Sequence, residues 1–121
     1  MPTLKITAKV RNDTSNYERG VAAATVTTTG AHVQVLRNTI ATTEETIAIA
    51  GDITGGQGPG YAFIYNADAT NYVQVGIATG AYFMRLKAGE SATLPLDSAI
   101  STLYLKANTA ACDVEVWIWE R

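Results

Sequence analysis

The sequence has little charge, a single cysteine and a single histidine, and no sustained helical periodicity. Charged residues make up 17% of the chain, whereas about 25% is usual in globular domains. The net charge of −2 argues against a nucleic-acid-binding surface, which needs a basic patch. Cys112 alone cannot form an internal disulfide. No apolar run has the length of a membrane span or the form of a signal segment, so we expect a cytoplasmic translation product.

Length and composition predict a single domain over residues 1–121. A chain of this size buries roughly two-thirds of its extended surface on folding, enough for a core without metal or disulfide. Thr, Ala and Val dominate, and the branched Cβ of Thr and Val suits a pleated sheet. A surface of Thr, Ala, Ser and Asn is typical of a protein that packs against others.

Short alternating segments separated by turn residues predict about nine or ten short strands, in an all-β, jelly-roll-like β-sandwich. Less than about a tenth of the chain should be helical, because no 3.6-residue pattern is sustained. The cleanest alternation is at the start, where Leu4, Ile6, Ala8 and Val10 share one face. The predicted strands are 3–11, 21–29, 31–39, 46–50, 61–65, 72–75, 81–88, 92–96, 102–107 and 112–119.

Two pairs of neighbouring strands look like hairpins. The segment 61–76 carries two aromatic and β-branched arms around the polar turn 66–71, whose Asn, Asp and Thr side chains bond their own backbone. Segments 21–29 and 31–39 form the second candidate, around Gly30. The segment 12–20 is predicted to be a loop.

Three further features predict local structure. Residues 51–60 contain five glycines and one proline, so we expect a mobile connector there. Thr followed by Glu permits a short helical turn at 42–45. Pro95 places its strand at a sheet edge or a bulge.

No residue pattern supports catalysis, a cofactor or a metal, so the chain is not expected to be an enzyme. The glycines of 55–60 lack the Lys-Ser/Thr ending of a phosphate loop and precede a strand. His32 is interpreted as an ordinary residue at a strand start, because it has too few partners for a zinc site and no nucleophile motif surrounds a serine. Cys112 is expected in the core, and the carboxylates in solvated turns.

The last strand is the most informative element. If Cys112 and the alternate residues after it face the core, Trp117 and Trp119 share the other face with Asp113 and Glu115. Three interpretations remain open: a subunit contact, in which tryptophan is enriched, a face covered by a loop of the same chain, or an aromatic platform for a sugar.

Three segments resemble small structural proteins of tailed bacteriophages: 60–76 (an aromatic strand, an N-x-D-x-T-N turn, then V-x-V-G), 83–96 (with L-K-A-G-E) and 103–110 (L-x-L-K-A-N-T-A). The segment 31–40 is also similar to that group. The resemblance implies a non-enzymatic virion component with a β-sandwich fold, assembled in the host cytoplasm.

That resemblance suggests a protein that decorates or cements the capsid as a trimer or a larger symmetric oligomer. The alternative is a receptor- or carbohydrate-binding module of a fibre or tail. Expected partners are further copies of this chain and the major capsid or another virion protein, with a glycan in the alternative. Candidate interface residues are Trp117, Trp119, Tyr61, Tyr65 and Tyr72.

Overall fold

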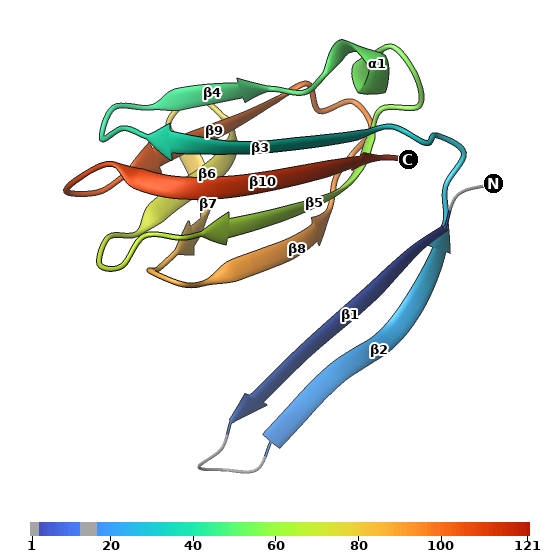
Figure 1. Ribbon diagram of the computed structural model, residues 1–121, viewed down its shortest axis with the longest axis horizontal. Helices are drawn as coiled ribbons and strands as arrows, with labels where there is room; N and C mark the ends of the chain where they lie inside the picture. The colour runs from blue at the N-terminus through green and yellow to red at the C-terminus, as the bar shows by residue number, and fades with distance from the viewer. Residues whose placement is uncertain (1–2, 13–16) are drawn as a thin grey trace.

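The structure, a computed structural model, describes residues 3–12 and 17–121, which form ten strands and one short helix (Figure 1). The strands are β1 (Thr3–Asn12), β2 (Tyr17–Thr27), β3 (Val33–Ile40), β4 (Glu45–Ala48), β5 (Pro59–Asn66), β6 (Val73–Ala78), β7 (Ala81–Leu86), β8 (Ser91–Pro95), β9 (Thr102–Ala107) and β10 (Cys112–Glu120), and the helix is α1 (Gly51–Thr54). With one helix of four residues among the described residues, the all-β prediction is confirmed.

Eight strands form a sandwich of two four-stranded antiparallel sheets, in the orders β3-β10-β5-β8 and β4-β9-β6-β7. The first strand of the eight therefore pairs with the last, the second with the seventh, the third with the sixth, and the two middle strands with each other. This nested pairing is the jelly-roll arrangement that the sequence predicts. Pro95 ends β8 at the edge of its sheet, as expected from its missing N–H.

The first two strands lie outside the sandwich. β1 and β2 pair only with each other among the described strands, and they form an arm that leaves the sandwich near the chain ends and diverges from β8 (Figure 1). The expected alternation of β1 is present, but the face is half-buried only at Leu4 and Ile6, whereas Val10 is 77% exposed. The predicted loop 12–20 is too long, because β2 begins at Tyr17; residues 13–16 lie outside the described part of the chain.

The core lies between the two sheets and is built by strict alternation. Along β10 the side chains alternate between buried and half-buried, and along β5 and β9 they do the same. Since one face of each strand is apolar and β-branched, burial against the opposite sheet fixes the register. The largest fully buried side chains of the core are Ile40, Ile53, Ile64, Leu103, Leu105, Ile118, Val73, Val75, Val114 and Val116.

The predicted hairpin 61–76 is wrong. β5 and β6 belong to different sheets, and residues 67–72 cross from one sheet to the other. Asn66 makes this crossing possible: its buried amide donates to the carbonyls of Asn71 and Leu86, and its Oδ1 accepts from the N–H of Asp68. The polar residues therefore form a turn, as predicted. The turn leads from one sheet to the other, because the side-chain amide of Asn66 is bonded inside the sandwich.

The second predicted hairpin is also wrong. β2 pairs with β1, and β3 pairs with β10, so residues 28–32 connect the arm to the sandwich rather than reversing a hairpin. Thr28 in this connection is buried, and its hydroxyl donates to the carbonyl of Gly30. In the pairing with β10, β3 buries Ile40 in the core and half-buries Gln34 and Leu36.

The glycine-rich connector is packed against the sandwich at Ile53 and at its end, and its other residues are exposed. Residues 51–54 form α1, with Ile53 fully buried, and Gly58, Pro59 and Gly60 are buried where β5 begins. Gly58 has φ +80°, and a Cβ there would lie 2.3 Å from the carbonyl oxygen of Ser98, so the close approach requires glycine. The helical turn expected at 42–45 does not form; Thr42 and Thr43 are bends, and β4 begins at Glu45.

Candidate functional site

The outer face of the sheet β3-β10-β5-β8 carries most of the predicted interface residues. Opposed residues of neighbouring strands point to the same side, so the register defines rows of side chains across this face. From β3 through β10 to β5 the rows are Val33, Trp119 and Tyr61; Val35, Trp117 and Phe63; and Arg37, Glu115 and Tyr65. We call the apolar part of these rows, Val33, Val35, Tyr61, Phe63, Tyr65, Trp117 and Trp119, the aromatic face.

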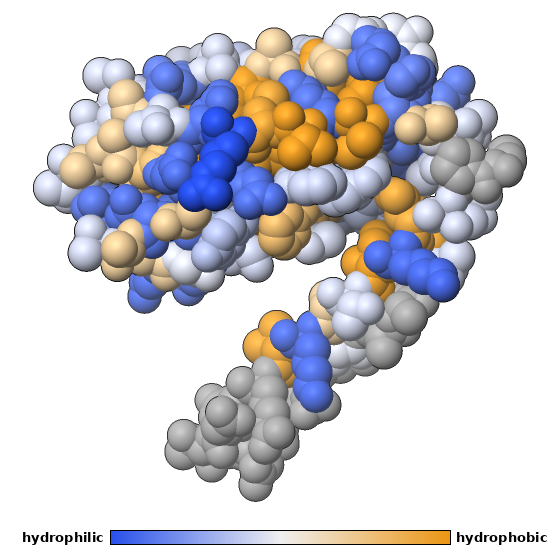
Figure 2. All heavy atoms as spheres, viewed as in Figure 1, coloured by the Kyte–Doolittle hydropathy of each residue, from blue (hydrophilic) through white to orange (hydrophobic). Residues whose placement is uncertain are grey.

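The two tryptophans stack on each other. Their ring centroids lie 5.8 Å apart with an interplanar angle of 24°. Both side chains are half-buried, as is Phe63, while Val33 and Val35 are 49% and 52% exposed. Figure 2, which looks onto this side of the molecule, shows hydrophobic side chains gathered over the sheet and at points along the arm. The sequence-based assignment of the two faces of β10 is thus correct.

Charged groups at one end of the aromatic face are paired with each other. The guanidinium of Arg37 donates to Asp113 at 2.8 and 2.9 Å, and this hydrogen bond raises the pKa of Arg37. The indole N–H of Trp117 donates to Glu115 at 2.6 Å. Because these groups bond to one another, they form a polar rim beside an apolar surface, which is the composition of a protein interface.

The root of the arm faces one side of the aromatic face. A cavity of about 330 Å³ lies between Thr3–Thr7 of β1 and the side chains of Tyr61, Phe63, Trp119 and Thr93. One of the three open interpretations is that a loop of the same chain covers this face. A segment of the same chain does lie beside part of the face, at Tyr61 and Trp119. The segment is the arm and not a loop of the sandwich.

Tyr72 is not part of this surface. It precedes β6 in the other sheet, where the guanidinium of Arg85 lies 4.2 Å from its ring centroid. Its backbone N–H donates to Asn108 Oδ1, and its carbonyl accepts from the N–H of Asn108. The structure brings Tyr61, Tyr65, Trp117 and Trp119 together and places Tyr72 elsewhere.

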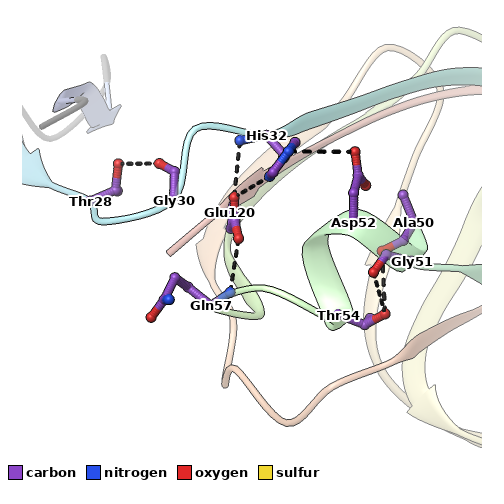
Figure 3. A network of polar contacts seen from close by, with 9 residues as sticks. All are labelled: Thr28, Gly30, His32, Ala50, Gly51, Asp52, Thr54, Gln57 and Glu120. Carbon is purple, nitrogen blue, oxygen red and sulfur yellow. Dashed lines mark hydrogen bonds and ion pairs between the residues drawn. The ribbon is translucent and has the colours of Figure 1, made fainter.

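Sequence reasoning missed a second polar cluster, centred on Glu120 (Figure 3). This side chain is only 3% exposed, and its carboxylate accepts from the backbone N–H groups of Gln57 and His32 at 2.8 and 3.1 Å. The ring nitrogen Nδ1 of His32 lies 2.6 Å from it. The bonds from Gln57, from the backbone of His32 and from its ring lower the pKa of Glu120 to about 2. The same carboxylate raises the pKa of His32.

Two glycines leave room for this carboxylate. A Cβ on Gly30 or on Gly56 would lie 2.1 Å from atoms of the Glu120 side chain. The N–H of Gly30 also donates to the carbonyl of Arg121. Glu120 thus ties the connection at the root of the arm, the segment after α1 and the last strand into one cluster, and its role is structural. The only signal of this cluster in the sequence is that an acidic residue, Glu120, ends an apolar strand.

Reactive chemistry has little basis in the described side chains. Over residues 3–12 and 17–121, no three His, Cys, Asp or Glu side chains are grouped as metal ligands. The thiol of Cys112 is buried, and desolvation raises its pKa, which disfavours the nucleophilic thiolate. In the glycine-rich segment, the N–H of Gln57 is already used by Glu120.

Comparisons with protein-family models, with curated proteins and with solved structures find no match to this chain. Within the described part of the chain, no helix has both the length and the apolar character needed to cross a bilayer.

Proposed function

We propose that this chain is a non-enzymatic structural protein of a tailed-bacteriophage virion, which decorates the capsid and assembles through the aromatic face. The observation that carries the proposal is the aromatic face itself: an outer sheet surface with half-buried Trp117, Trp119 and Phe63, about half-exposed Val33 and Val35, and a polar rim of bonded side chains. Contiguous exposed apolar surface of this kind marks an interaction site.

The resemblance of the segments at 60–76, 83–96 and 103–110 to phage structural proteins supports the virion as the setting. In the structure these segments supply β5 to β9 and their connections, so the similarity concerns the parts that build the sandwich. The partners in this proposal are other copies of the chain, as a trimer or larger symmetric oligomer, and a capsid protein.

The alternative, a carbohydrate- or receptor-binding module of a fibre or tail, is favoured by one observation. The cavity of about 330 Å³ has aromatic walls from Tyr61, Phe63 and Trp119 and hydroxyl groups from Thr3, Thr7 and Thr93. Ring faces beside hydroxyl groups suit a sugar, whose apolar and polar sides differ. Against it, Glu115 and the Trp117 indole are bonded to each other.

The two proposals predict different locations in the particle. Antibodies raised against the protein and detected with gold in electron micrographs of the parent phage should label the head if the protein decorates the capsid. Labelling of the tail or of fibres, together with binding on a glycan array, would favour the alternative. Unlabelled particles that nonetheless contain every other structural protein would contradict both proposals.

A further inference from the structure

We propose that the β1–β2 arm of one copy docks on the aromatic face of a second copy of this chain. This inference rests on the proposed function, because it names the occupant of the surface through which the protein assembles. The root of a chain's own arm faces the side of Tyr61 and Trp119, and the neighbour's arm would cover the remaining part around Val33, Val35 and Trp117.

None of the arm side chains that the structure describes belongs to the sandwich core, and none of those within β1 and β2 is fully buried. The buried core residues all belong to the sandwich, from Ile40 to Ile118. A two-stranded hairpin alone is only marginally stable in water, and stability requires packing against another surface. Leu4 and Ile6 obtain such packing at the root, but farther along the same face of β1, Ala8 is exposed and Val10 is 77% exposed.

The arm and the sandwich have opposite charge. Residues 3–27 contain four Lys or Arg and two Asp or Glu, a net charge of +2, whereas residues 28–121 contain five and nine, a net charge of −4. Within one copy the arm diverges from its own sandwich (Figure 1), so this attraction is best satisfied by the sandwich of another copy. Complementary charge steers association and favours this orientation over contact between two arms.

The dimensions allow the contact. A strand of ten residues such as β1 is about 33 Å long, while four strands side by side span about 19 Å. One arm can therefore cross the whole sheet of its partner. The direction of the arm is set at its root, where Thr28 is buried and Gly30 and His32 are bonded to the last two residues of the chain.

Photo-cross-linking of the full chain tests the proposal directly. Val10→p-benzoylphenylalanine protein is prepared with ¹⁴N and with ¹⁵N, the two are mixed and irradiated, and the adducts are analysed by mass spectrometry. We expect adducts that join ¹⁴N to ¹⁵N chains, with the probe attached to peptides of β3, β5 or β10. The matched control is Phe83→p-benzoylphenylalanine, because Phe83 is 59% exposed in the other sheet and should give no such adducts.

Sedimentation velocity gives a second measurement. Val10→Asp should weaken self-association at least about tenfold, since a charge would enter an apolar contact, while Phe83→Asp should leave it unchanged. Adducts confined to single chains would show that the arm folds onto its own sandwich, and adducts on the other sheet would show a different docking surface. Either result, or an unchanged association of Val10→Asp, would overturn the arm contact, whereas the proposed function would fall only if the particles lack the protein.

Discussion

The ring of His32 and the carboxylate of Glu120 lie 2.6 Å apart, although 88 residues separate them in the chain. His32 precedes β3, and Glu120 is the last residue of β10. The pair therefore closes the same end of the sandwich from which the arm leaves. Asp52 of α1 lies 4.0 Å from the other ring nitrogen, so the imidazole is flanked by carboxylates on both sides. We therefore expect the stability of the sandwich to depend on pH in two separate ranges, one for each member of the pair.

Glu120→Gln should destabilise the protein at neutral pH. It should also make the stability of the protein depend less on pH in the acid range. The pKa of Glu120 is about 2 in the folded state, below the unfolded value of 4.5, so its contribution is complete above pH 4.5 and is lost as pH falls toward 2. Thermal melts of wild type and variant at several pH values measure the difference. Glu90→Gln, which changes an exposed turn carboxylate, is the control and should retain the acid dependence. A parallel pH profile for Glu120→Gln and wild type would contradict the assignment.

Wild-type protein should lose stability as the pH rises above 6.5, and His32→Gln should remove this loss. The folded pKa of His32 is raised above 6.5, so its stabilising charge is fully present below pH 6.5 and disappears as pH rises through the raised value. Wild-type melting temperature should therefore fall over this range, while the melting temperature of His32→Gln should change less. Histidine titration by NMR provides the independent check, and an ordinary pKa would refute the pairing.

Asn66→Ala should cost about 1–3 kcal/mol in the free energy of unfolding, because the carbonyls of Asn71 and Leu86 lose a buried donor. Urea denaturation measures this loss. Asn71→Ala is the matched control: the Asn71 side-chain amide donates to the exposed hydroxyl of Thr70, and its removal should cost less than about 0.5 kcal/mol. Equal losses in the two variants would argue that Asn66 does not organise the crossing between sheets.

Trp119→Ala should weaken self-association about 30-fold, or about 2 kcal/mol, while the sandwich remains folded. Trp119 is half-buried on the outside of the sheet, so its removal leaves the core between the sheets intact. Sedimentation velocity and a thermal melt together measure the two effects. Tyr72→Ala, on the other sheet, should leave association unchanged. A wild-type protein that stays monomeric at tens of micromolar would exclude self-association, although docking on a capsid protein would remain a prediction.

The sequence predicts the strands well because alternation is a local property. The strand at 102–107 agrees with β9 at both ends, and the buried face of β10 is the one expected from Cys112 and Val114. Partner choice is not local. Neighbouring segments such as 21–29 and 31–39 resemble hairpin arms, yet the jelly roll pairs strands that are distant in sequence, and both predicted hairpins fail for this reason.

The candidate site could be predicted only in part for the same reason. Alternation places Trp117 and Trp119 on one face, but only the register between β3, β10 and β5 adds Val33 and Val35 and excludes Tyr72. The cluster of Glu120 and His32 depends on a contact across the whole sandwich. An exposed-looking acid at the end of a strand gives no sign that two backbone N–H groups will surround it.

The central position of β10 determines the order in which the molecule can form. β10 bridges β3 and β5, and it supplies Cys112, Val114, Val116 and Ile118 to the core. During synthesis on the ribosome, the arm hairpin and the β6–β7 pair can form from neighbouring residues and β5 can pair with β8, but β3 and the other edge of β5 stay unpaired until β10 has emerged. The sandwich therefore closes in one late step, once the residues of β10 are available to pair. The nascent chain is exposed to edge-to-edge aggregation until then, and fast elongation through the last strand would shorten that interval.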